Sequence, residues 1–415
     1  MVLLNDLTYL HNPITRRGET RCIFSYSGDY EFQVWPGDSD KLMIYFQGGG
    51  GKMERERSEG QEERRTAGAV PDKHCHAHFL RTPFLVAACW TEATTVVPLC
   101  TTSCMKQLNQ GLFDKTNDKN PYKDYTIVHI MYCSGDAHAG NSTRSYNDFK
   151  GQPVQQVGAI NVQTTLDWIV DQTDFWDADG LTDLVISGAS AGSLGAQVWA
   201  DNILTEFKTN LPYQRAAVIP DSYIGVFPDG SQGPTMIDFG VCKSNVLENS
   251  PDLLEKCNNS ELTLQEISTA AMQRHIDVPF AWIQSKRDVV QKAYFDAIAL
   301  TVDKTISAIG NVEFYKDCNQ IIADYVSNNK NAVSYVVDSL MHTYTLLPIV
   351  YSTSSKGVAG GGDDMSMIDW LTQFPMNKGE TVKSVCDGSV VDLDNHPSHY
   401  TNYCASEAQS SYTQE

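Results

Sequence analysis

A run of small residues between a predicted strand and a predicted helix constrains the fold most. Leu184 to Ile186 is an apolar run of strand length, Gly188-Ala189-Ser190-Ala191-Gly192 follows it, and apolar residues then recur at helical spacing. A Gly-x-Ser-x-Gly turn in this position lifts the serine above the edge of a sheet and points the next N–H at a developing oxyanion. A purely structural turn is the alternative. The flanking strand and helix favour Ser190 as a nucleophile.

Apolar runs of strand length alternate with helical patterns along the chain. Val157 to Val170 has helical spacing, and the further strand candidates are Lys41 to Phe46, Tyr125 to Tyr132, Ala216 to Ile219, Val278 to Ile283 and Ser334 to Val337. Such alternation is typical of a mainly parallel sheet with helices on both faces, whose sites lie beyond the carboxyl ends of the strands. The sequence therefore predicts one α/β-hydrolase-like domain over residues 1–415.

A nucleophilic serine needs a histidine to take its proton and a carboxylate to hold that histidine. In α/β-hydrolases the order along the chain is serine, acid, histidine. Asp288 follows the predicted strand Val278 to Ile283 and is the favoured acid, although a loop aspartate is often only a turn former or a helix cap. Asp221, after the preceding strand, is the alternative.

The favoured base is His342, which lies just beyond the late strand Ser334 to Val337. His396 and His399 lie in a polar tail that no strand precedes. His129 lies inside an apolar run, where a hydrogen-bonded core histidine is the expectation. The predicted catalytic set is therefore Ser190, Asp288 and His342.

Four consecutive glycines follow the strand Lys41 to Phe46. Gly48 to Gly51 allow the chain to turn tightly and to expose backbone N–H groups. A strand that ends in such a loop suits the binding of an oxyanion.

Composition excludes several classes of partner and suggests a compartment. A net charge of -20 opposes binding to nucleic acid or to an anionic membrane, since both require a basic face. No apolar stretch is long enough to span a membrane. Eleven cysteines and two glycosylation sequons, at Asn141 and Asn258, favour a secreted protein, although the start of the chain does not resemble a signal peptide. We expect a monomer.

At these residues the chain resembles the pectin acetylesterase and Notum family of carboxylesterases. The similar blocks occur in the family's order within Lys41 to Cys386, and they are Tyr45-Phe46-Gln47-Gly48-Gly49-Gly50, Ala88-Cys89-Trp90, Ser187-Gly188-Ala189-Ser190-Ala191-Gly192, Asp221-Ser222, the Asp288 region, Met341-His342-Thr343 and Met367-Ile368-Asp369-Trp370-Leu371. The resemblance implies Ser190 as nucleophile, Asp288 as acid and His342 as base. It also implies that Gly49, Gly50 and Ala191 supply the oxyanion N–H groups.

One segment departs from the family pattern. The family usually runs almost directly from the glycine loop into the Ala-Cys-Trp block, whereas Lys52 to Ala87 separates the two here, as either an atypical surface insertion or a translated intron. Without Cys75 of this segment, ten cysteines remain, an even number that could form five disulfides. We therefore expect Cys75 to be free and the other ten to be oxidised.

The same segment offers a rival chemistry. His74, Cys75, His76 and His78 are potential zinc or copper ligands, but so tight a spacing does not easily surround one tetrahedral ion. Ester hydrolysis by a serine requires no metal and no cofactor, and none is predicted.

The sequence does not decide between several classes of ester substrate. The resemblance implies removal of O-acetyl groups from polysaccharide, with a Notum-like deacylation of a fatty-acylated protein or a small-ester or polyester hydrolysis as alternatives. A net charge of -20 would repel a polyuronate such as pectin unless the cleft were locally basic. A non-catalytic carbohydrate-binding protein on the same fold is the alternative of another class.

Overall fold

The structure of the 415-residue chain is a computed structural model, and it describes residues 9–11, 20–25, 27, 29–49, 107–148, 150–302, 308–355, 364–388, 404 and 410–414. Within these ranges, helices that combine the length and the apolar character needed to cross a bilayer are absent. The segment Lys52 to Ala87 with its four potential metal ligands, and also Gly50, His396 and His399, lie outside the described residues.

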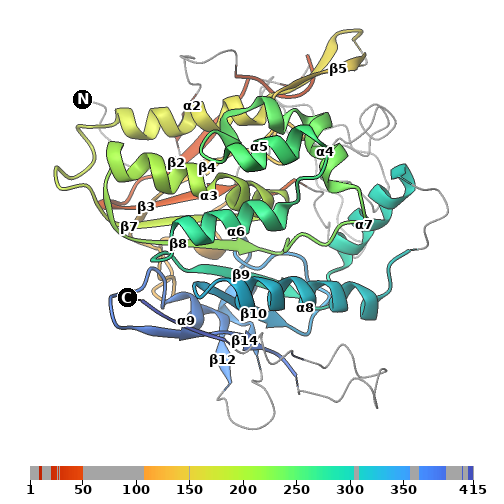
Figure 1. The fold of residues 1–415 in the computed structure, drawn as a ribbon. Helices are drawn as coiled ribbons and strands as arrows, with labels where there is room; N and C mark the ends of the chain where they lie inside the picture. The colour runs from red at the N-terminus through yellow and green to blue at the C-terminus, as the bar shows by residue number, and fades with distance from the viewer. Residues whose placement is uncertain are drawn as a thin grey trace, which may run out of the picture.

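A nine-stranded sheet forms the centre of the described fold (Figure 1). Its strand order is β1-β2-β4-β3-β7-β8-β9-β10-β14, in which β2 pairs antiparallel with both β1 and β4 and every later neighbour pairs parallel. The strands of this sheet are β1 Tyr9–His11, β2 Phe32–Trp35, β3 Asp38–Phe46, β4 Tyr125–Ile130, β7 Leu181–Ala189, β8 Tyr213–Asp221, β9 Phe280–Ser285, β10 Ala332–Val337 and β14 Val385–Cys386. Three two-stranded sheets are formed by β5 Ser142–Asn147 with β6 Pro153–Gln156, β11 Ser354–Ser355 with β12 Met365–Ser366, and β13 Thr381–Lys383 with β15 Ser411–Thr413.

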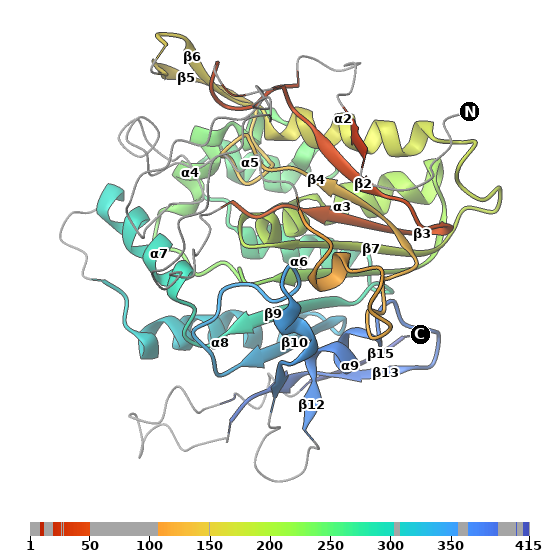
Figure 2. The ribbon, with the colours of Figure 1, turned by 180° about the vertical axis from the view of Figure 1, so that it is seen from behind.

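Two apolar cores lie on opposite faces of the central sheet because side chains alternate along each strand. On β3, Leu42, Ile44 and Phe46 point into the larger core, whereas Met43 and Tyr45 point into the smaller one. Long helices cover the larger core, and α2, α3 and α6 lie in front of the sheet in Figure 1 and behind it in Figure 2. The helices are α2 Gly158–Asp171, α3 Ala191–Asn210, α4 Gln232–Phe239, α5 Pro251–Asn258, α6 Leu264–Arg274, α7 Val289–Val302 and α8 Asn311–Asn328.

Shorter helical turns cover the smaller core. They include η1 Gly111–Phe113, η4 Pro348–Tyr351 and α9 Met367–Leu371, while η2 Val241–Lys243 and η3 Asn245–Leu247 lie beside α4 and α5. The mainly parallel sheet with helices around it confirms the predicted α/β-hydrolase-like fold. It also places the carboxyl ends of β3, β7, β8, β9 and β10 at one edge, because these strands run parallel.

Three disulfides occur among the described cysteines. They join Cys22 to Cys133, Cys242 to Cys257 and Cys386 to Cys404. The prediction that every cysteine except Cys75 is oxidised is wrong for Cys318, which is a free thiol. Cys318 lies in the larger core on α8 with no exposed surface, where a thiol packs as a small apolar group. The remaining four, Cys75, Cys89, Cys100 and Cys104, lie outside the described residues.

Candidate active site

Ser190 lies on a strained turn between β7 and α3. It is the N-cap of α3 and has φ 58° and ψ -124°, a backbone conformation that is costly for a residue with a side chain. The two flanking glycines are required by close contacts. A Cβ on Gly188 would lie 2.2 Å from the Gly192 carbonyl oxygen, and one on Gly192 would lie 2.0 Å from the Phe46 carbonyl oxygen. The Gly-x-Ser-x-Gly turn thus has the strand-turn-helix context that the sequence predicts.

The glycine loop passes directly against this turn. A Cβ on Gly48 would lie 2.5 Å from the Ala189 carbonyl oxygen and 3.0 Å from the Ser190 Cβ. Gly49 follows and is buried, whereas Gly50 is not described. Ala191 is the first residue of α3, so its N–H has no acceptor within the helix. Of the three predicted oxyanion donors, Ala191 therefore adjoins Ser190, and Gly49 follows directly after the glycine that contacts the Ser190 turn.

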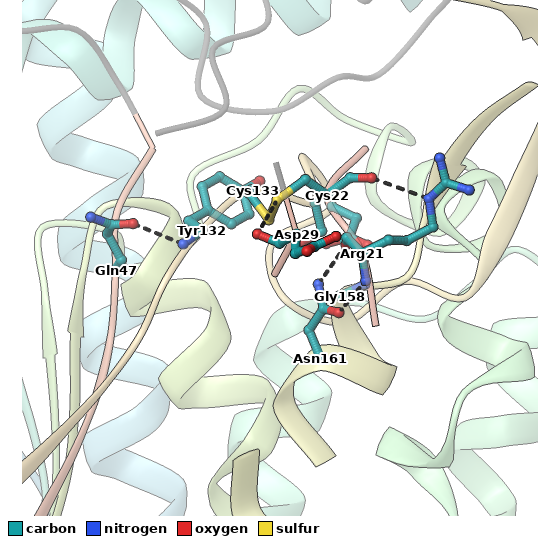
Figure 3. Close-up of a disulfide and its surroundings, with 10 residues drawn as sticks. Arg21, Cys22, Asp29, Gln47, Tyr132, Cys133, Gly158 and Asn161 are labelled. Atoms are coloured by element: carbon teal, nitrogen blue, oxygen red, sulfur yellow. Dashed lines mark hydrogen bonds between the residues drawn. A yellow bond between two sulfur atoms is a disulfide. The ribbon is translucent and has the colours of Figure 1, made fainter. Parts of the chain in front are cut away.

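Gln47 anchors the start of the glycine loop, and sequence reasoning missed its partners. The Tyr132 backbone N–H donates to Gln47 Oε1 at 2.8 Å, beside the Cys22 to Cys133 disulfide (Figure 3). His138 Nε2 lies 2.8 Å from the Gln47 carbonyl oxygen, which can only accept, so Nε2 carries the proton. Burial lowers the pKa of His138 to about 4, which keeps the ring neutral. The Tyr132-Cys133 pair that follows β4 was the signal in the sequence that could have indicated these contacts.

Asp288 and His342 form a hydrogen bond beyond the ends of β9 and β10. His342 Nδ1 lies 2.7 Å from Asp288 Oδ2, and Asp288 is completely buried. The other oxygen, Oδ1, accepts from the N–H groups of Val290 and Gln291 and so caps α7. Asp288 is thus both a helix cap and the partner of a histidine, two roles that the sequence presented as alternatives.

Gln291 is a further neighbour of this pair that sequence reasoning missed. Its side-chain Nε2 donates to Asp288 Oδ2 at 2.8 Å and lies 3.2 Å from Gln284 Oε1. Gln291 lies three residues after the helix-capping Asp288, and this spacing was the signal in the sequence that could have indicated the contact. This contact fixes the Oδ2 atom that holds His342.

His342 has one ring nitrogen without a hydrogen-bond partner among the described residues, and its pKa is raised. Its Nε2 is buried and has no hydrogen-bond partner among the described residues, Ser190 included. Burial lowers the pKa of His342, but the negative charge of Asp288, its hydrogen bond and the charge of Asp221 outweigh burial and raise the pKa above 6.5. A ring held at Nδ1 with Nε2 unpaired can accept a proton at Nε2.

The alternative acid, Asp221, makes different contacts. Its Oδ2 accepts from the backbone N–H groups of Tyr344 and Thr345 and from Thr345 Oγ1, and its Oδ1 accepts from Ser222 Oγ. Its carbonyl oxygen accepts from the Ser190 N–H at 2.9 Å. The structure therefore joins Asp288 to His342 directly and links Ser190 to the histidine loop through Asp221.

Of the other histidines considered in the sequence analysis, His129 lies within the described residues. His129 is a core residue on β4, as expected, and its Nδ1 lies 3.1 Å from Gln33 Oε1. Burial lowers its pKa to about 3. In the part of the chain that the structure describes, no cluster of three or more His, Cys, Asp or Glu side chains could hold a metal ion.

Comparison with known proteins identifies the family. The family model described as Pectinacetylesterase matches residues 86–358, which is more than half of the chain. The match begins at the end of the segment Lys52 to Ala87 and includes Ser190, Asp288 and His342. No curated protein matches the sequence. The chain belongs to the pectinacetylesterase family and is a carboxylesterase-type hydrolase.

Proposed function

We propose that this protein hydrolyses O-acetyl esters of polysaccharide, with Ser190 as nucleophile, His342 as general base and Asp288 as the acid that orients His342. The observation that carries the proposal is the 2.7 Å hydrogen bond between His342 Nδ1 and Asp288 Oδ2, which leaves His342 Nε2 buried and unpaired. The strained turn at Ser190 and the glycine loop against it supply the other parts of an acyl-transfer site.

In the first half of the reaction, Ser190 Oγ attacks the carbonyl carbon of the ester and its proton passes to His342 Nε2. The N–H groups of Ala191, Gly49 and Gly50 stabilise the negative oxygen of the tetrahedral intermediate, where loss of one donor typically costs about 10² to 10³ in turnover. His342 then donates its proton to the leaving alcohol oxygen, and an acetyl group remains on Ser190.

In the second half, His342 takes a proton from water, and the water oxygen attacks the acetyl carbonyl carbon. Collapse of the intermediate releases acetic acid, which keeps the second proton of the water until it ionises in solution, and returns the proton from His342 to Ser190 Oγ. The carboxylate of Asp288 stabilises the imidazolium that forms twice in the cycle.

The substrate class rests on the family. A pectinacetylesterase family member is expected to act on acetyl esters of glycans, and the net charge of -20 favours glycans less anionic than a polyuronate. A panel of p-nitrophenyl esters of increasing chain length, together with acetylated neutral and acidic glycans, tests this assignment. We expect acetyl esters to give the highest kcat/KM. Preference for long acyl chains would contradict it.

The nucleophile is tested by Ser190→Ala with Ser268→Ala as matched control. Ser268 is also a buried serine, and its hydroxyl donates to Gln197 Oε1 on a different part of the chain. We expect Ser190→Ala to keep the melting temperature, to lose about 10⁴-fold or more in turnover and to resist labelling by a serine-directed phosphonate. The control should keep its activity and its labelling. More than a few per cent residual activity in Ser190→Ala would rule out this serine.

A further inference from the structure

Three of the residues with a positive φ are linked to one buried aspartate. Ser190, Ser222 and Thr343 have φ of 58°, 61° and 66°, a region that residues with a side chain rarely adopt. They lie on three different segments, the turn after β7, the end of β8 and the loop after β10. Strained residues persist only where their surroundings hold them, so this grouping calls for a common anchor.

Asp221 is that anchor, since each of the three residues is tied to it within one or two hydrogen bonds. Its carbonyl oxygen accepts from the Ser190 N–H at 2.9 Å. Its Oδ1 accepts from Ser222 Oγ at 2.6 Å, and the same Ser222 Oγ accepts from the Thr343 N–H at 2.9 Å. The backbone at the nucleophile and next to the base therefore depends on residues 221 and 222.

The other carboxylate oxygen holds the rest of the histidine loop. Asp221 Oδ2 accepts from the N–H groups of Tyr344 and Thr345, both at 2.8 Å, and from Thr345 Oγ1 at 2.6 Å. Thr345 Oγ1 lies 2.7 Å from the hydroxyl of Tyr45, which is on β3, the strand that leads into the glycine loop. One residue with no exposed surface thus connects the segments that carry the nucleophile, through its backbone carbonyl, and the base and the oxyanion loop, through its side chain.

The charge of Asp221 also acts on the base. Asp288 and Asp221 are the two carboxylates that raise the pKa of His342, and Asp288 has the larger effect. Arg287 and Asp338 lie nearby and form an ion pair with each other at 2.9 Å. Burial raises the pKa of Tyr344 to about 12, so the Tyr344 hydroxyl is neutral. Burial raises the pKa of Asp221 itself above its usual value, and the two backbone N–H donors and two hydroxyls on its oxygens, which favour the ionised form, only partly offset this rise.

Resting on the proposed function, we infer that Asp221 and Ser222 are positioning residues that hold the backbone of residues 343 to 345, and so set where His342 presents Nε2 to Ser190. Neither residue touches the substrate. The role differs from that of the triad acid, because Asp221 contacts the loop backbone and the His342 ring is held by Asp288.

Ser222→Ala tests the inference with little risk to folding. The change removes the acceptor of the Thr343 N–H and one donor to Asp221. We expect kcat to fall about tenfold with KM within about twofold, because misplaced catalytic groups lose rate more than binding. Thr345→Val, which removes the hydroxyl that donates to Asp221 and contacts Tyr45, should lose less, and Ser268→Ala should lose nothing. A folded Ser222→Ala with the wild-type kcat overturns the inference.

Asp221→Asn tests the charge. Protonated His342 cannot act as a base, so kcat falls as pH drops through the pKa of His342. Removing the nearby negative charge lowers that pKa, and the acid limb of the kcat profile should move to lower pH. An unmoved limb overturns the inference, and if this variant does not fold, Ser222→Ala and Thr345→Val decide.

Failure of the proposed function is recognised separately. If the wild-type protein hydrolyses no ester, the ring NMR titration of His342 still measures its pKa without any substrate. A lower pKa of His342 in Asp221→Asn than in wild type would then support the inference alone, and an unchanged pKa would overturn it.

Discussion

Two buried aspartates at neighbouring strand ends show how similar sequence signals give different contacts. Asp221 ends β8 and directs Oδ2 to the loop that carries His342, mainly to its backbone, and Oδ1 to the hydroxyl of the adjacent Ser222. Asp288 follows β9 and divides its oxygens between the N-terminus of α7 and the His342 ring. The comparison indicates that position after a strand selects candidates, while the acid is recognised by which atoms its oxygens reach.

The largest expected effect separates these two aspartates directly. Asp288→Asn should lower kcat by about 10³ to 10⁴-fold, because an amide cannot stabilise the imidazolium and favours the wrong tautomer. The fold-loss of kcat in Asp221→Asn should be smaller by a factor of about 100, because this variant leaves the Asp288 to His342 hydrogen bond in place. Steady-state kinetics on p-nitrophenyl acetate compare the two variants.

The control for Asp288→Asn is Asp148→Asn. Asp148 is another buried aspartate that accepts from backbone N–H groups, those of Ser25 and Lys150, and it has no contact with the candidate site among the described residues. This variant should keep its kcat. A greater loss in Asp221→Asn than in Asp288→Asn would show that the acid is Asp221.

A smaller effect is expected from the glutamine that holds Asp288. Gln291→Leu removes the donor to Asp288 Oδ2 but leaves the backbone cap on Oδ1. We expect kcat to fall about tenfold, equivalent to about 1.4 kcal/mol of barrier, with KM nearly unchanged. Gln320→Leu is the matched control, because Gln320 also donates to an aspartate, Asp324, but on the exposed side of α8. An equal kcat in both variants would remove Gln291 from the site.

The sequence predicted the strands near the site because their cores are continuous apolar runs. Each predicted run lies largely within an observed strand, as for β10, and Val157 to Val170 lies within one residue of α2. The antiparallel strands β1 and β2 were not predicted. β2 has only four residues, too few to show a pattern, and β1 has only three.

The site could be predicted only as far as local patterns carry information. Ser190, Asp288 and His342 each follow a recognisable strand, so their residue types and order were sufficient to nominate them. The contacts of Ser222 and Gln47 depend on segments 121 and 85 residues away, and short-range periodicity does not encode such contacts. The number of cysteines likewise could not indicate that Cys318 is unpaired.

The smallest expected effect concerns that unpaired cysteine, which lies in the core near Asp288. Burial raises the pKa of the Cys318 thiol well above its usual value, and the charges of Asp288 and Asp317 raise it further. A buried, protonated thiol is a poor nucleophile, so Cys318 should not react with iodoacetamide in the native protein and should react fully after unfolding without reductant. Cys318→Ala should keep kcat, since no catalytic contact is lost, and should cost about 1 kcal/mol of unfolding free energy through a small cavity. Peptide mapping of the unreduced protein provides the measurement. Alkylation of the native protein at Cys318, or a disulfide to this residue, would show that the interior behind Asp288 is arranged differently from the contacts described above.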